Sequence, residues 1–179
     1  ELFKPPPRAI DEAPWGSAER KMRIALVVEG TRGDVQPMLV LGSALAAEGH
    51  QILVCASPDF RAASEAAGHA FCAVGTDVRA YLTAHAESID GSAHKALVAG
   101  VRFTRDTVRE QFAALPDATA NADLIIGAGV QVAGPSVAQL HGIAYRYVAY
   151  CPAILPSKAH PPFLVPAQTL PPWANRLAW

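Results

Sequence analysis

The sequence predicts an α/β protein built on a doubly wound parallel sheet. Short continuous apolar runs such as Ile24 to Val28 suit strands that are buried on both faces. Segments with helical spacing of apolar residues separate these runs, and a repeated strand–helix order requires parallel strands with right-handed crossovers. The chain has 179 residues, 51% of them apolar, which is enough for one domain with a sizeable core.

The first strand, Ile24 to Val28, is expected to lead into a helix over Val35 to Glu48. Pro37 fits the first turn of that helix, and Gly49 fits the position just beyond its end. The helix places three apolar residues on one face: Met38, Leu41 and Leu45.

The second strand is expected at Ile52 to Ala56. Ser57-Pro58-Asp59 then supplies an N-cap, a proline in the first helical position and an acidic first turn, so a helix should run to about Gly68. Ala70 to Val74 is expected as a short third strand. The segment from Gly75 to Gly91 gives no clear prediction.

The second half of the chain continues the alternation. Ala93 to Leu115 has the apolar spacing of a long amphipathic helix. A fourth strand is expected at Asp123 to Gly127 and a fifth at Ala144 to Ala149. A helix over Gly134 to Leu140 should connect them. The proline-rich remainder, Tyr150 to Trp179, should form loops and short turns.

We expect two regions in the chain: an extended, proline-containing tail or linker over residues 1–21, and a single domain over residues 22–179.

The formal charge of −1, from 15 basic and 16 acidic residues, disfavours nucleic acid as a partner. No apolar run approaches the ~18 residues of a membrane span. Three widely spaced cysteines suit reduced thiols, and the six histidines lack metal-ligand spacing. We therefore predict a cytoplasmic protein, with peripheral membrane association as the alternative.

The predicted topology locates the functional site. In a doubly wound sheet the first and fourth strands are adjacent at the centre, and ligands bind beyond the carboxyl ends of the strands there. Two glycine-containing segments lie at that point: Glu29 to Asp34 and Gly127 to Gly129. Glycine allows close backbone approach to a ligand, and the helix that follows each strand directs its N-terminal dipole to the same crevice.

The most informative segment is Gly30-Thr31-Arg32-Gly33-Asp34-Val35-Gln36-Pro37, directly after the first strand. It contains neither the Gly-x-Gly-x-x-Gly of a dinucleotide site nor the Gly-Lys-Ser/Thr of a phosphate loop. It closely resembles the loop of GT-B glycosyltransferases with a family 28-type N-terminal domain. That group includes sterol glucosyltransferases and enzymes that glycosylate antibiotic aglycones. The resemblance extends from Met22 to Trp179.

The resemblance implies an inverting transfer of a hexose from a nucleotide sugar, such as UDP-glucose, to a hydroxyl of an apolar sterol, lipid or natural-product aglycone. It also implies that the chain is the acceptor-side half of a Rossmann-like, two-domain architecture. The donor domain would lie outside this chain, so we expect the isolated chain to be inactive. No cofactor is implied beyond the nucleotide sugar as co-substrate, and no metal.

The resemblance also assigns the site residues. Asp34 falls where the family places an acidic group, so it is the candidate catalytic base. Thr31 and Arg32 match positions that face the nucleotide sugar, and we expect Gly30, Gly33 and Gly129 to contribute to substrate binding. A carboxylate near the acceptor hydroxyl can take its proton, and backbone amides at a helix N-terminus can stabilise the leaving diphosphate without a metal.

Each site residue also has a purely structural interpretation. Asp34 can serve as the N-cap of the helix that starts at Val35, and both roles are compatible only if one carboxylate oxygen stays free. Arg32 can be a solvated loop charge, and Gly30 and Gly33 can serve a tight turn. Two alternatives for the whole chain stay open: a non-catalytic ligand-binding domain, and an unrelated nucleotide- or flavin-binding Rossmann-like protein.

Overall fold

A computed structural model describes residues 21–75, 93–150, 154–162 and 170–178, with only the backbone described for 93–100. Its centre is an all-parallel five-stranded sheet in the order β3-β2-β1-β4-β5. The strands are β1 (Arg23–Glu29), β2 (Gln51–Ala56), β3 (Ala70–Ala73), β4 (Leu124–Gly129) and β5 (Ala144–Tyr147). The predicted doubly wound sheet, with the first and fourth strands adjacent, is confirmed.

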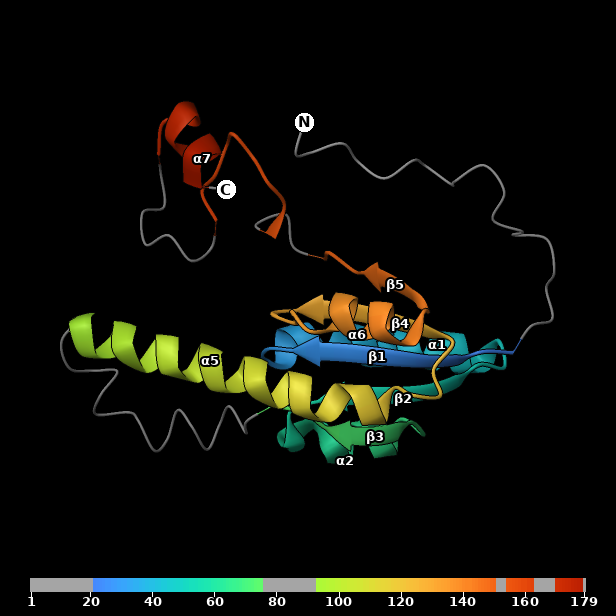
Figure 1. Cartoon of the computed structure of the whole chain (residues 1–179). Coiled ribbons are helices and arrows are strands. Elements are labelled where there is room, and N and C mark those ends of the chain that lie inside the picture. The colour runs from blue at the N-terminus through green and yellow to red at the C-terminus, as the bar shows by residue number, and fades with distance from the viewer. Residues whose placement is uncertain (1–20, 76–92, 151–153, 163–169, 179) are drawn as a thin grey trace.

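Helices cover both faces of the sheet. Figure 1 shows α5 (Ala93–Ala118) and α6 (Gly134–His141) in front of the strands and α1 (Arg32–Ala47) behind them. A short 3₁₀ turn, Pro58–Phe60, and α2 (Arg61–Ala66) connect β2 to β3. This layering explains the continuous apolar runs, since a strand with helices on both faces exposes neither.

The core is divided by β1 into two clusters. Ile24, Leu26 and Val28 face α1, where Val35 and Met38 are buried against them. Ala25 and Val27 face the other side and join a second cluster that includes Leu115, Val137 and Ala138 from α5 and α6. The alternation continues to Glu29, whose side chain therefore lies on the α5 side of the sheet, at its carboxyl edge.

Several element boundaries differ from those expected. The first helix begins at Arg32 instead of Val35, so Pro37 lies inside the helix and not in its first turn. Strand β4 continues through Gly127 to Gly129, because both residues pair with β1, and the glycines belong to the strand instead of a following loop. The long helix extends through Pro116 to Ala118. The expected 58–68 helix is divided into the 3₁₀ turn and α2.

The proline-rich end of the chain contains one short helix, α7 (Pro172–Ala178), which stands apart from the sheet in Figure 1. Buried Asn175 fixes it by donating hydrogen bonds to the carbonyls of Lys158 (2.8 Å) and Leu170 (3.2 Å). Among the described residues no helix is both long and apolar enough to cross a bilayer. The expected tail over residues 1–20, the unassigned 76–91 segment and Cys151 lie outside the described residues.

Candidate functional site

The loop between β1 and α1 is organised by a hydrogen-bonded pair, Thr31 and Asp34. Thr31 is the N-cap of α1, and Asp34 is the third residue of the helix. Asp34 Oδ2 accepts hydrogen bonds from the Thr31 backbone N–H (2.7 Å) and from Thr31 Oγ1 (3.1 Å). The expectation that Asp34 is itself the N-cap is therefore wrong: its carboxylate reaches back to the cap residue and completes a capping box.

The capping contacts of Asp34 occupy one carboxylate oxygen. None of the described residues donates a hydrogen bond to Oδ1, and the side chain is half-buried. The geometry therefore meets the condition for a second role of Asp34, which is that one carboxylate oxygen is not used by the helix cap. The helix terminus holds the carboxylate in one orientation while its second oxygen remains available to another group.

Gly30 is required by this arrangement. It has a φ of 151°, and a Cβ placed on it would overlap the carboxylate of Asp34. Gly33 differs, because a Cβ there would meet only Thr31 Oγ1, at 3.7 Å. The tight-turn interpretation thus applies to Gly30, whereas Gly33 is under no comparable steric constraint.

Arg32 lies on the exposed first turn of α1. With the Gln36 amide turned so that its oxygen faces the guanidinium, Gln36 accepts hydrogen bonds from Arg32 Nε (3.0 Å) and Nη2 (3.1 Å). Arg32 is therefore tethered along its own helix. It remains exposed, as do Thr31 and Gly33.

Gly129 brings the second glycine-containing segment against the first. It pairs with Glu29, has a φ of 67°, and would place a Cβ onto the Glu29 carbonyl and 3.6 Å from Asp34 Cβ. The structure therefore places the carboxyl end of β4 beside Asp34. These are the two segments that the sequence placed at the same edge of the sheet.

Two tyrosines near Asp34 were not identified as site residues from the sequence. Tyr147 donates a hydrogen bond to the Gly129 carbonyl (2.7 Å), and Tyr150 donates one to the Asp34 carbonyl (2.6 Å). Burial is the main cause that raises the pKa of Tyr147, and the negative charge of Asp34 adds to it. Burial also raises the pKa of Tyr150, to about 12, with smaller contributions from Asp34 and Tyr147. Both hydroxyls are therefore neutral donors at physiological pH.

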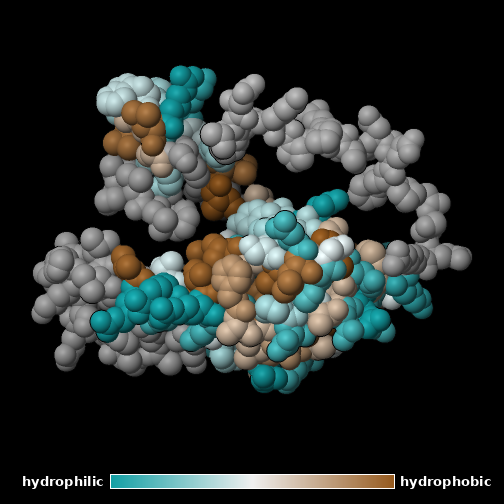
Figure 2. Space-filling view, viewed as in Figure 1, coloured by the Kyte–Doolittle hydropathy of each residue, from teal (hydrophilic) through white to brown (hydrophobic). Residues whose placement is uncertain are grey.

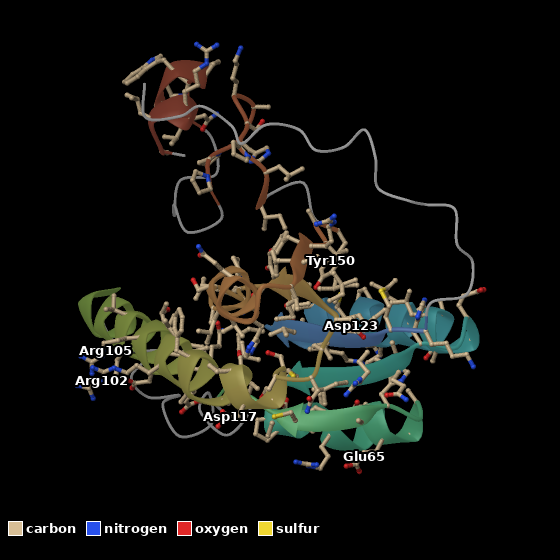
Figure 3. The ribbon with its side chains drawn as sticks, turned by 45° about the vertical axis from the view of Figure 1, so that its right-hand side comes forward. Glu65, Arg102, Arg105, Asp117, Asp123 and Tyr150 are labelled. Carbon is tan, nitrogen blue, oxygen red and sulfur yellow. The ribbon has the colours of Figure 1, made fainter. Side chains whose placement is uncertain are left out.

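Figure 3 shows Tyr150 above the sheet, where the chain leaves β5 toward α7. The only signal in the sequence for these tyrosines was their recurrence around the end of the fifth strand, Tyr145, Tyr147 and Tyr150, at the edge where ligands bind. Their contacts with β4 and α1 depend on tertiary structure.

Glu29 was expected only as the start of the loop segment, and sequence reasoning did not identify its buried carboxyl. It is 4% exposed, and within the described part of the chain neither carboxylate oxygen has a hydrogen-bond partner of normal geometry. Burial is the main cause that raises its pKa to about 7, with Glu110 and Asp59 adding to the shift and nearby Gln111 opposing it. A buried carboxyl therefore lies at the carboxyl edge of the sheet, where a Cβ on Gly75 would overlap it.

Buried Gln111 on α5 shapes the loop between β4 and α6. Its Oε1 accepts hydrogen bonds from the N–H groups of Val132 (3.1 Å) and Ala133 (3.3 Å), and its Nε2 donates to the Val130 carbonyl (3.4 Å). The side chains of Val130 and Val132 remain outside, each 49% exposed. In Figure 2, hydrophobic residues gather over the end of β4 and over α6, and a hydrophilic stretch of α5 lies to their left.

Exposed apolar side chains lie on the two segments that adjoin the Asp34 loop, the end of β4 and the end of β5, and we call this set the exposed apolar face: Val130, Val132, Tyr147 and Tyr150. A polar group that can accept a proton therefore adjoins a surface that suits an apolar ligand. A separate cavity of about 150 Å³, lined in part by Arg23, Gln51 and Asn121, lies at the amino ends of the strands. That edge is opposite the one at which ligands of doubly wound sheets bind.

The comparisons with known proteins agree with this geometry. Residues 24–146 match the glycosyltransferase family 28 N-terminal domain. Glycosyltransferase GtfE from Amycolatopsis orientalis is 32% identical over 144 residues, which cover 79% of this chain and 34% of that protein. Sterol 3-beta-glucosyltransferase UGT80B1 from Arabidopsis thaliana is 41% identical over 59 residues, covering 33% of this chain and 10% of that protein.

Among solved structures, CalG4, the calicheamicin glycosyltransferase, superposes with a TM-score of 0.55 at 23% identity. The match covers 72% of this chain and 32% of CalG4. The fold is thus the Rossmann-like N-terminal domain of the GT-B glycosyltransferases. The chain belongs to the family defined by the glycosyltransferase family 28 N-terminal domain. It spans about a third of the length of GtfE.

Proposed function

We propose that this chain is the acceptor-side half of an inverting glycosyltransferase that moves a hexose from a nucleotide sugar to a hydroxyl of an apolar acceptor. The family match supports sugar transfer, and the name of one relative, a sterol 3-beta-glucosyltransferase, supports a hexose and an apolar hydroxyl-bearing acceptor. The single observation that carries the proposal is Asp34 Oδ1, held in place through Oδ2 and open on its own side.

In the proposed reaction the acceptor oxygen attacks the anomeric carbon on the face opposite the departing diphosphate. The new C–O bond forms as the bond between the anomeric carbon and the phosphate oxygen breaks, which inverts the configuration. Asp34 Oδ1 takes the hydroxyl proton, a contribution of roughly 10²–10⁴-fold for general base catalysis. The leaving nucleoside diphosphate departs with the bonding electron pair, and oriented N–H groups can stabilise its charge without a metal.

The remaining site residues have roles in binding. Gly30 and Gly129 keep side chains away from Asp34, so a sugar can approach the backbone. Thr31, Arg32 and Gly33 are exposed at the start of α1, where they can face the nucleotide sugar. The apolar face around Val130 and Tyr150 would receive the acceptor.

The experiment is a sugar-transfer assay on the full-length protein that contains this domain, with Asp34→Asn as the variant. An asparagine can still accept the Thr31 hydrogen bonds, so the loop should persist while the base is lost. We expect kcat to fall by about 10²-fold or more. The matched control is Asp117→Asn, the same change on the exposed last turn of α5 (Figure 3), which should leave kcat unaltered. Unchanged turnover in Asp34→Asn would remove this residue from the mechanism.

A non-catalytic ligand-binding domain is the second candidate, and the exposure of the apolar face within this chain favours it. Titration of sterols and antibiotic aglycones into the 179-residue chain separates the two functions. Binding by this chain, without transfer in the full-length protein, would support a binding domain. Transfer that is lost in Asp34→Asn would support the enzyme.

A further inference from the structure

Two cysteines face each other across neighbouring strands at the far side of the sheet from β5. Cys55 of β2 pairs directly with Cys72 of β3, and both side chains belong to the core cluster on the α5 side. Neighbouring strands lie ~4.8 Å apart. The two Cα atoms are therefore within the 4.4–6.8 Å range that a disulfide spans, and both Cβ atoms project from the same face. Both thiols are free in this structure.

The two thiols differ in environment. Cys55 is fully buried, whereas Cys72 is partly exposed on the edge strand. The neighbouring Cys55 thiol is the main cause that lowers the pKa of Cys72 to about 6. Burial opposes the shift, and the positive charge of Arg61 adds to it. The neighbouring Cys72, followed by burial, raises the pKa of Cys55 well above its usual range. Cys72 Sγ itself lies 3.8 Å from the Ala73 carbonyl, to which it donates a hydrogen bond when protonated.

Two of the described elements bring charged groups near Cys72: α2 carries Arg61, whose charge acts on the thiol, and α5 carries Glu110, which lines a hollow together with Ala73 and Val74. Arg61 of α2 lies over the ring of Phe71, 4.8 Å from its centroid, and also pairs with Glu65 at 3.2 Å. On the other side, α5 contributes Ala114 and Ala118 to the cluster, which carry no charge. Cys72 thus combines the features of a reactive thiolate: partial exposure, a second thiol on the neighbouring strand and a nearby cation.

We propose that Cys72 is a site of oxidation by hydroperoxides and that Cys55 resolves the oxidised form into a Cys55–Cys72 disulfide. The Cys72 thiolate attacks the outer peroxide oxygen, so an S–O bond forms, the O–O bond breaks, and an alcohol or water leaves after taking up a proton. The Cys55 sulfur then attacks the Cys72 sulfenic acid. The S–S bond forms, the S–O bond breaks, and water departs with the Cys55 proton. Two thiols lose two electrons in total, and the peroxide gains them.

The position of the pair in the fold allows the second step. Strand β3 has four residues and, in the sheet formed by the described residues, pairs with β2 alone, so it can shift by the fraction of an ångström that the Cβ atoms require. Its carboxyl end leads through Val74 to Gly75, which lies against Glu29. A disulfide would therefore link β3 covalently to β2 near the carboxyl ends of these strands. The proposed site lies at the carboxyl ends of the neighbouring strands.

The first test measures the pH dependence of Cys72 alkylation in the intact chain, read by peptide mass spectrometry. We expect a midpoint near 6 in the unmodified sequence. Cys55→Ala removes the neighbouring thiol, the main cause of the lowered pKa, and should raise the midpoint by about 2 pH units, toward the ~8.5 of an ordinary cysteine. Cys55→Ser retains a hydroxyl donor and should largely restore the low midpoint. A midpoint that is the same in all three proteins would overturn the role of Cys55.

The second test exposes the protein to hydrogen peroxide, blocks remaining thiols and maps disulfides. We expect a Cys55–Cys72 cross-link in the unmodified chain and in Cys151→Ser, the matched control for the third cysteine. Cys55→Ser should instead accumulate a sulfenic acid at Cys72 that dimedone traps. Absence of the Cys55–Cys72 cross-link, with Cys72 recovered as a thiol at peroxide levels that oxidise free cysteine, would refute the proposal.

Discussion

Tyr150 donates its hydroxyl hydrogen to the backbone carbonyl of Asp34 at 2.6 Å, and 116 residues separate the two in the chain. The bond links the segment after β5 to the first turn of α1. Tyr147 makes the equivalent contact with Gly129, at 2.7 Å. Through these two hydroxyls, the end of the fifth strand is attached to both segments of the candidate site.

Tyr150→Phe should lower the free energy of unfolding by about 1 kcal/mol, the net value of one hydrogen bond of this kind. In the full-length protein we expect KM for the acceptor to rise more than kcat falls, since Tyr150 lies on the apolar face and not at Asp34 Oδ1. Denaturant unfolding and steady-state kinetics provide the two measurements. A loss confined to kcat would contradict a binding role.

Gly30→Ala should be more harmful than Gly33→Ala. A Cβ on Gly30 overlaps the Asp34 carboxylate and also demands a positive φ. We expect a loss of about 2 kcal/mol or more, through backbone strain and the broken cap. Gly33 lies in the first turn of α1 with open space around it, so alanine there should be neutral or slightly stabilising. Equal effects in denaturant unfolding would show that Asp34 does not hold this loop.

Glu29→Gln should change how stability depends on pH. The pKa of Glu29 is raised in the folded chain from its ordinary 4.5 to about 7. The unfolded chain therefore releases this proton first, and stability falls as pH rises from about 4.5 through 7. The penalty above pH 7 is about 3 kcal/mol.

Glutamine keeps the shape without the charge, so the variant should be more stable than the parent at pH 8 and nearly equal to it at pH 4.5. Glu48→Gln, at the exposed end of α1, is the control and should leave the pH profile of the parent unchanged. The measurement is the denaturant midpoint across this pH range. Parallel profiles for the parent and Glu29→Gln would show that Glu29 does not titrate in this window.

Gln111→Leu should loosen the loop between β4 and α6. The change leaves the N–H groups of Val132 and Ala133 without their acceptor, at a cost of about 2–4 kcal/mol. Amide hydrogen exchange at these two residues should accelerate well before exchange in β1. Gln139→Leu on the exposed side of α6 is the matched substitution and should alter neither.

The strands were predicted well from the sequence because their signal is local. Each run of apolar residues is buried on both faces, and the strand–helix alternation permits few topologies. Boundaries were less well predicted. The start of α1 was misplaced because Thr31 and Asp34 cap the helix together, and the pairing is recognised only when their side chains are seen to meet.

The candidate site was predicted in part. Gly30, Asp34 and Gly129 were expected at one edge of the sheet, and the structure brings them together. Tyr147, Tyr150 and Gln111 were missed, because none belongs to a motif, and Glu29 was recognised only as the start of the loop segment and not for its buried carboxyl. Each acquires its position from a partner on another element, such as the Asp34 carbonyl for Tyr150.

The sequence by itself determined the strand–helix alternation, the adjacency of the first and fourth strands, the loop that carries Asp34 and the resemblance to one family, since apolar runs and an eight-residue motif are properties of neighbouring residues. Only the tertiary structure decided which oxygen of Asp34 is occupied, that Glu29 is buried with no hydrogen-bond partner among the described residues, and that Cys55 faces Cys72. The physical reason is that hydrogen bonding and desolvation depend on groups that are distant in the chain and meet only when the sheet has formed.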